Sequence, residues 1–155
     1  MNTRFEKKAA FKIAGLSVHD GIKSDFIGTW DNLYKKVSLE QLSSLGSGES
    51  FGASYDFKTQ ECFSYIAGYD VTDEAKAKLL GLDMIAVPAA EYLVVELHGT
   101  MPQCIKDGWA YFNETYFPEN NFMHAGTPDF ELYFDGDPDD PNYQMELWVP
   151  VVAKE

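Results

Sequence analysis

The chain has 155 residues, of which 45% are hydrophobic and 15% aromatic, and its 25 acidic against 12 basic residues give a formal net charge of −13. This length and apolar content favour one folded domain over a disordered chain. The negative charge repels phosphate backbones, which disfavours direct nucleic-acid binding, and it attracts organic cations or a basic protein partner.

Cysteine and histidine usage argues against a metal centre or a disulfide framework. Cys62 and Cys104 lie far apart, and the three histidines are scattered without metal-ligand spacing. We therefore expect neither a metal nor another cofactor. The N-terminal segment lacks the apolar stretch of a secretion signal, and no segment approaches the length of a membrane span. The cytoplasm is the expected compartment, without membrane contact.

The first half of the chain predicts a strand followed by a helix. Residues 11–20 have the composition of a strand. Ser24 or Asp25 can cap a helix that runs to about Lys36, because apolar residues then recur at spacings of three and four. A capping-box pattern opens a further short turn over 38–44.

Two strands separated by a polar tripeptide complete this half. They are expected over 51–57 and 61–71, and their short connection predicts a hairpin. Thr72 is then expected to cap a short helix over 73–80 that Gly81 closes.

The second half repeats this order. A strong strand is expected over 91–97, and Pro102 is well placed in the first turn of a helix that reaches about Tyr116 and ends before Pro118. A loop over 119–127 leads into two more strands. These last strands are expected over 129–134 and 143–150.

The last two strands carry the most informative pattern. Side chains alternate between the faces of a strand, so Glu131 and Tyr133 share one face, as do Glu146 and Trp148. If the aliphatic faces of both strands pack on a common core, the opposite face presents two carboxylates flanked by aromatic rings. This arrangement suits an organic cation through charge and cation–π attraction.

Landmark residues recur along the chain at a nearly constant offset. Trp30 and Trp109 differ by 79 positions, and Tyr55 and Tyr133 by 78. A period this long indicates an internal duplication of a βαββ unit. We therefore predict a single α+β domain of tandem βαββ units, with antiparallel sheets, two main helices and a pseudo-two-fold axis at a central ligand cleft. The repeats are expected over about 11–71 and about 84–152.

The duplicated order, the run PDFELY at 128–133 and the run ELWVPV at 146–151 resemble the gyrase-inhibitor-like (GyrI-like) small-molecule-binding family. This family includes the effector-binding domains of AraC-type and MerR-type transcription activators. The resemblance implies a pocket for hydrophobic, often cationic, drugs, in which Glu131 meets the positive charge and Glu146 and Trp148 take part. Because about ten residues precede the first expected strand, we expect a stand-alone module, similar to drug-binding modules of integron cassettes.

A ligand site of six residues is predicted on this basis, with Trp30 assigned to the helix core and Trp109 open between core and cleft. The six residues are Glu131, Glu146, Tyr133, Trp148, Trp109 and Tyr65.

The favoured function is the binding of hydrophobic cationic compounds, for sensing or sequestration. One alternative is a hydrolase of strained, cyclopropane-bearing compounds, in which Glu131 acts as the acid or base. Another is an acidic protein that engages a basic partner such as gyrase. A protein partner, either a regulator or gyrase, and a homodimer both stay open.

Overall fold

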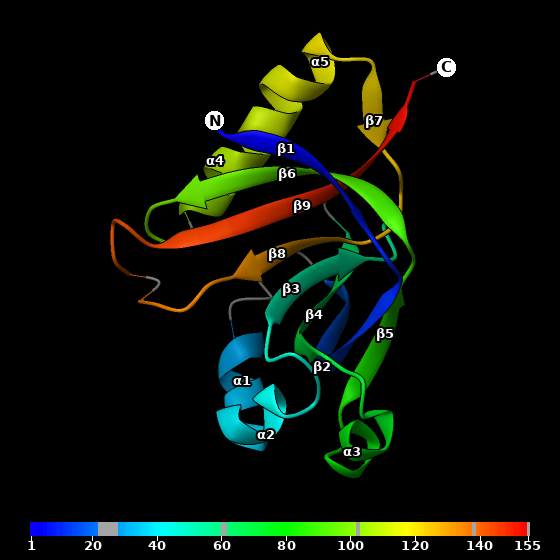
Figure 1. Cartoon of the computed structure of the whole chain (residues 1–155), viewed down its shortest axis with the longest axis vertical. Helices are drawn as coiled ribbons and strands as arrows, with labels where there is room; N and C mark the ends of the chain where they lie inside the picture. Colours follow the sequence, from blue (N-terminus) through cyan, green and yellow to red (C-terminus); the bar gives the residue numbers. More distant parts are fainter. Residues whose placement is uncertain (22–27, 60–61, 102, 138, 155) are drawn as a thin grey trace.

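Antiparallel strands dominate the structure, a computed structural model that describes residues 1–21, 28–59, 62–101, 103–137 and 139–154 (Figure 1). The strands are β1 (Thr3–Lys8), β2 (Phe11–Gly21), β3 (Ser50–Tyr55), β4 (Phe63–Asp70), β5 (Asp83–Val87), β6 (Ala90–His98), β7 (Phe122–His124), β8 (Asp129–Tyr133) and β9 (Gln144–Ala153). The helices are α1 (Thr29–Lys36), α2 (Leu39–Ser43), α3 (Glu74–Leu79), α4 (Gln103–Tyr111) and α5 (Phe117–Glu119), with a π-helical turn over Phe112–Tyr116.

The strand order is symmetric about its centre. It reads β1-β6-β9-β8-β3-β4-β2-β5, and β7 pairs beside β9. The triplets β6-β9-β8 and β3-β4-β2 therefore mirror each other across the β3–β8 pair. The edge strands are exchanged, because β1 precedes β2 in the chain but pairs with β6, while β5 precedes β6 but pairs with β2. The expected α+β fold of two βαββ units is confirmed, and the exact repeat boundaries stay predictions.

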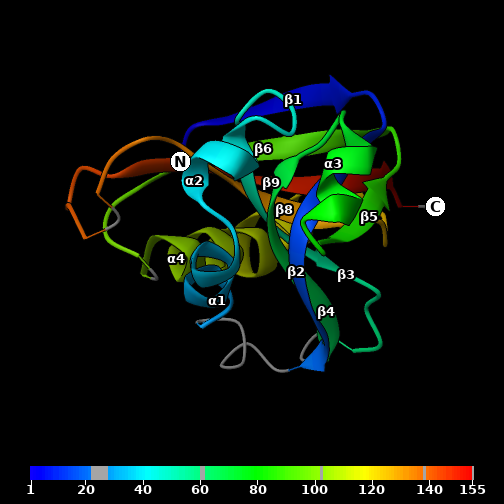
Figure 2. The same cartoon turned by 90° about the horizontal axis from the view of Figure 1, so that it is seen from below.

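The main helices cover one face of the sheet, which we call the helix face. Helix α1 packs on β2 and β4, and α4 packs on β6; the two helices lie next to each other in Figure 2. Leu33 of α1 and Tyr65 of β4 belong to one buried cluster there, and Phe112 and Leu147 to a second. Within the described ranges, no helix combines the length and apolar character needed to cross a lipid bilayer.

The other face, which we call the aromatic face, carries a chain of contacting rings. Phe51 and Phe130 meet edge to face with centroids 5.3 Å apart, and Phe130 stacks on Trp148 at 5.5 Å. Tyr92 contacts both Phe130 and Trp148. Edge-to-face and stacked pairs at such distances contribute beyond the area that they bury.

The helix caps follow the predicted chemistry with one correction. The Ser38 side chain accepts from the Gln41 backbone N–H, and the Gln41 side chain accepts from the Ser38 backbone N–H. The capping box before α2 is therefore confirmed. The predicted Thr72 cap of α3 is wrong: Asp73 accepts from the Lys76 backbone N–H instead. Aspartate is a strong N-cap residue, while the Thr72 hydroxyl donates to the Leu45 carbonyl.

Other turn predictions had mixed outcomes. Gly81 follows α3 with φ of +72°, as expected for a glycine that closes a helix. The predicted helix end before Pro118 is wrong, because the helical backbone continues through the π-helical turn into α5, which contains Pro118. The predicted cap at Ser24 or Asp25, and Pro102, lie outside the described residues.

Three strands were not predicted. β1 alternates charged and apolar residues in the N-terminal segment, β5 precedes the predicted 91–97 strand, and β7 is a three-residue strand inside the predicted 119–127 loop. In addition, β8 ends at Tyr133, so Phe134 does not continue its apolar face and is 41% exposed.

Candidate functional site

Glu131 and Glu146 lie on opposite faces of the sheet. In the β8–β9 pair, Glu131 is opposite Leu147, and Leu132 is opposite Glu146. Residues directly opposite each other in an antiparallel pair project to the same face. The expectation that the two carboxylates share one face is therefore wrong, because the aliphatic face of β8 is paired with the acidic face of β9.

Glu131 is on the helix face and is only 8% exposed. In β3 its direct partner is Gly52. Burial raises the pKa of Tyr65, and burial also raises the pKa of Tyr133; the negative charge of Glu131 raises both values further. The same charge reaches Cys104 in the first turn of α4. The charge of Glu131 thus acts on both tyrosines and on the start of α4.

Two tyrosines and a tryptophan gather beside this carboxylate. The indole Nε1 of Trp30 donates to the Tyr65 hydroxyl at 3.0 Å, and Tyr133 also donates to that hydroxyl. The rings of Trp30 and Tyr133 meet edge to face, with centroids 5.4 Å apart and planes at 90°. We call Trp30, Tyr65, Tyr133 and Glu131 the Glu131 cluster.

Gly52 makes the tyrosine pair fit against β3. A Cβ atom at this position would lie 2.3 Å from the Tyr65 hydroxyl oxygen and 2.9 Å from that of Tyr133. Such distances are far below van der Waals contact, so any side chain at Gly52 would displace both hydroxyls. A glycine inside a strand often marks a close approach of this kind.

Trp109 approaches the helix face from the second half of the chain. Its ring lies 5.8 Å from that of Phe112. Trp109 and Tyr133 both pack against the buried cluster that contains Met145 and Leu147. The structure therefore places Trp109 on the same face as Glu131, on the α4 side.

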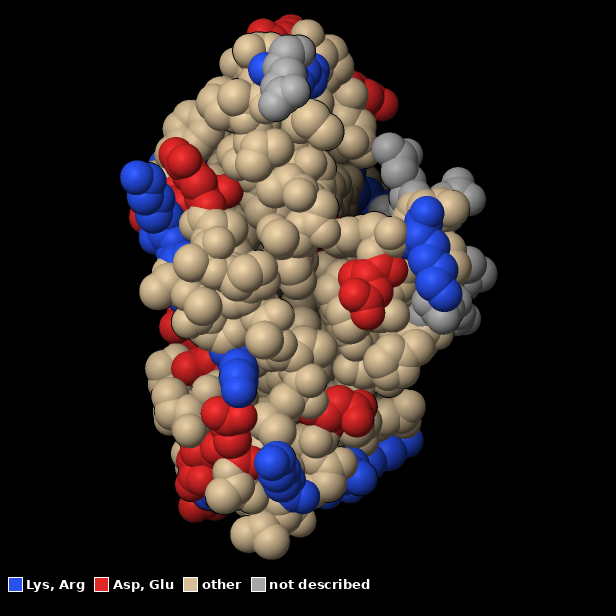
Figure 3. Space-filling view, turned by 90° about the vertical axis from the view of Figure 1, so that its right-hand side faces the viewer, with Lys and Arg blue, Asp and Glu red and all other residues tan. Residues whose placement is uncertain are grey.

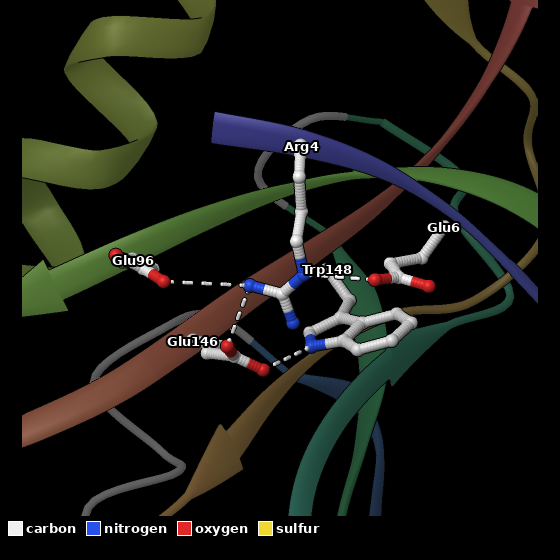
Figure 4. Close-up of polar contacts among 5 residues, drawn as sticks. All are labelled: Arg4, Glu6, Glu96, Glu146 and Trp148. Carbon is white, nitrogen blue, oxygen red and sulfur yellow. Dashed lines mark hydrogen bonds and ion pairs between the residues drawn. The ribbon is translucent and has the colours of Figure 1, made fainter. Parts of the chain in front are cut away.

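Glu146 and Trp148 belong to a different group, on the aromatic face (Figure 4). Glu146 is 7% exposed; it pairs with Arg4 at 2.8 Å and accepts from the Trp148 indole at 3.1 Å. The Arg4 guanidinium also contacts Glu6 at 2.9 Å and Glu96 at 3.6 Å, and lies 5.8 Å from the centre of the Trp148 ring. The hydrogen bond that Arg4 donates to Glu146 is the main reason why the pKa of Arg4 is raised. We call these five residues the Arg4 cluster.

Of the six predicted site residues, the structure brings Glu131, Tyr133 and Tyr65 together and separates Glu146 and Trp148 from them. Sequence reasoning missed two members of the surroundings, Trp30 and Gly52. The duplication was the signal available for Trp30, since it matches Trp109 at an offset of 79. For Gly52, the signal was a glycine in mid-strand.

Two hollows are lined by described residues outside the Glu131 cluster. One, of about 320 Å³, is lined by Met1, Asn2, Glu96, Leu97, His98, Cys104 and Asp107. The other lies beside residues 7–9 and 89–91. Neither of these two hollows includes a residue of the Glu131 cluster, and the central cleft stays a prediction.

Comparison with known proteins identifies the fold family. Residues 1–152 match the family model of the GyrI-like small molecule binding domain. A search among curated proteins finds no match.

Solved structures share the fold at low sequence identity. SAV2435 bound to tetraphenylphosphonium has a TM-score of 0.81 and 21% identity, over 98% of this chain and 94% of that one. An integron cassette protein from the mobile metagenome of Vibrio cholerae has a TM-score of 0.66 and 22% identity, over 97% and 95% of the chains. A hydrolase encoded by lin2189 from Listeria innocua has a TM-score of 0.56 and 9% identity, over 97% and 91%.

Proposed function

The chain belongs to the family of GyrI-like small molecule binding domains, and we propose that its ligands are hydrophobic organic cations held at the Glu131 cluster. The observation that carries this proposal is a buried carboxylate among three aromatic side chains. A buried carboxylate favours a positive charge beside it, and aromatic rings attract cations through their faces.

The arrangement of the cluster supports recognition of a large, delocalised cation. Trp30 and Tyr133 meet at a right angle, so they offer an edge and a face to a guest with several rings. The hydrogen bonds to the Tyr65 hydroxyl hold these rings in place. Trp109 would extend the apolar wall from α4. Rings already held in place lose little freedom when a ligand binds.

The distribution of charge on the molecular surface favours a small-molecule ligand over a basic protein partner that would need a broad acidic interface. Although the net charge is −13, basic side chains stand among acidic ones on the face shown in Figure 3, and much of that face is uncharged. The tetraphenylphosphonium bound to SAV2435 supports an organic cation as the ligand class for this chain.

Three related aryl compounds of different charge test the proposal. Tetraphenylphosphonium is a cation, tetraphenylborate is the anion of the same shape, and triphenylphosphine oxide is neutral. We expect calorimetry to show clear binding of the cation, weaker binding of the neutral compound and none of the anion. Recovery of the intact ligand after prolonged incubation distinguishes binding from hydrolysis.

Glu131→Gln keeps the size of the side chain and removes its charge. Breaking a buried charge pair costs about 3–5 kcal/mol, so the affinity for tetraphenylphosphonium should fall by at least about a hundredfold. Affinity for triphenylphosphine oxide should change by less than about threefold. Glu146→Gln, on the other face, is the matched control and should leave both affinities unchanged. Equal losses for the cation and the neutral compound in Glu131→Gln would contradict a counter-ion role.

A further inference from the structure

Three sulfur atoms meet at the start of α4. Cys104 Sγ lies 3.6 Å from Met101 Sδ and 3.7 Å from Met145 Sδ. The three residues come from the turn before α4, from α4 itself and from β9, so the fold brings them together. A thiol has one proton, and only one of these contacts can be a hydrogen bond at a time. The lone pairs of both thioethers therefore converge on the same thiol.

The spacing of these atoms is close to that of ligands around one metal ion. Metal–sulfur bonds are about 2.3 Å long, so two sulfur ligands of a trigonal ion lie about 4 Å apart. The observed separations of 3.6 and 3.7 Å need only a small adjustment to reach this value. Thiolate and thioether ligands favour soft ions such as Cu⁺ over hard divalent ions such as Mg²⁺ and Ca²⁺.

Access and local charge also favour a cation at this position. The hollow of about 320 Å³ is lined by Cys104 and by residues nearer the surface, including Met1 and His98, whose sulfur and imidazole groups are further donors for a soft ion. The negative charges of Asp107 and Glu131 act at Cys104 and attract a positive ion.

We infer that Cys104, Met101 and Met145 form a binding site for a soft monovalent metal ion, Cu⁺ or Ag⁺. On binding, the S–H bond of Cys104 breaks, a sulfur–metal bond forms and the proton passes to solvent, with no change in oxidation state. The site shares no residue with the Glu131 cluster, although Met145 lies directly opposite Tyr133 in the sheet.

Silver nitrate in chloride-free buffer is the probe, because Ag⁺ needs no reductant. Cys62 is the second of the two cysteines, so Cys62→Ser provides a background with a single thiol. Calorimetry on this protein should show one Ag⁺ per chain. Met145→Leu, which nearly preserves volume and hydrophobicity, should weaken binding at least tenfold, whereas Met123→Leu, at a 50% exposed methionine, should leave it unchanged.

X-ray absorption at the silver edge provides a second readout that does not depend on any variant. Three sulfur neighbours per ion are expected, and Cys104→Ser should abolish stoichiometric binding. Affinity that is unchanged in both Met101→Leu and Met145→Leu, or a single sulfur neighbour, would overturn the proposal, because the thiol alone would then hold the ion. If Cys104→Ser fails to fold, the methionine variants and the absorption spectrum still decide the question.

Discussion

Glu131 and Glu146 lie on neighbouring strands, each is buried, and each is followed two residues later by an aromatic side chain. Their surroundings nevertheless differ in kind. Glu146 has the Arg4 guanidinium at 2.8 Å and the Trp148 indole at 3.1 Å. Among the described residues, the charge of Glu131 instead acts on Tyr65, Tyr133 and Cys104 at the start of α4. A glutamate and an aromatic residue on one strand face thus do not define a ligand site by themselves, because the neighbouring strands decide what surrounds them.

The largest effect on the Glu131 cluster is expected when a side chain fills the space that Gly52 leaves for it. In Gly52→Ala the added methyl would overlap the Tyr65 hydroxyl, at 2.3 Å. We expect tetraphenylphosphonium affinity to fall more than tenfold and the free energy of unfolding to fall by about 1–3 kcal/mol. Calorimetry and urea unfolding measure the two effects.

Gly28→Ala is the control for this substitution, since a Cβ there would meet nothing within 4 Å. It should leave the affinity for tetraphenylphosphonium unchanged. Unchanged ligand affinity in Gly52→Ala would show that the hydroxyl position of Tyr65 is not required for binding.

Removing the internal cation tests the other side of the comparison. Arg4→Met keeps an apolar chain over Trp148 but leaves the buried Glu146 without its guanidinium partner. Because the Arg4 side chain is 38% exposed, the free energy of unfolding should fall by about 1–2 kcal/mol, less than for a fully buried pair. Urea unfolding of Arg4→Met, Glu146→Gln and the double variant gives the coupling between them.

The affinity for tetraphenylphosphonium should not change in Arg4→Met. If it falls as much as in Glu131→Gln, the two clusters act as one site and the contrast between the faces of the sheet fails.

Alkaline pH should act on the Glu131 cluster through its tyrosines. Burial raises the pKa of Tyr65 and of Tyr133, so the folded chain keeps protons that an unfolded tyrosine releases near pH 10. The resulting stabilisation is fully present below about pH 10 and is lost as the pH rises above it. Each such tyrosine should lower the free energy of unfolding by up to about 1.4 kcal/mol per pH unit in that range.

Urea unfolding at about pH 9 and about pH 11 measures this loss. In Tyr133→Phe the free energy of unfolding should fall less steeply with pH, by the contribution of one tyrosine, because phenylalanine cannot ionise. An identical decline in wild type and Tyr133→Phe would mean that Tyr133 does not contribute to the pH dependence.

The smallest effect is expected from a single hydrogen bond. Trp30→Phe keeps a ring beside Tyr133 but removes the indole N–H that Tyr65 accepts. A neutral hydrogen bond contributes about 1 kcal/mol, and we expect tetraphenylphosphonium to bind about threefold more weakly. Trp148→Phe removes the corresponding N–H from Glu146 on the other face, so its ligand affinity should match that of wild type. Calorimetry on both variants decides whether only the helix face responds.

The alternation of side chains was enough to predict which residues of β8 and of β9 share a face. It could not predict how the two strands align, because a shift of one residue turns a whole strand over, and the long acidic connection between them does not set the register. Trp30 illustrates a second limit. Helical spacing indicates that a side chain is buried, but not which partner it meets, and its contact with Tyr65 spans 35 positions. The pairing of β1 with β6 is likewise long-range.

The exchanged edge strands make each repeat incomplete without the other. The outer side of β2 is covered by β5, from the second half of the chain, and the outer side of β6 is covered by β1, from the first half. Two fragments divided between Leu79 and Asp83 would each expose a row of backbone donors and acceptors whose complement belongs to the other fragment. Folding should therefore be cooperative across the entire polypeptide, and the separated fragments should recover their structure only by reassociating.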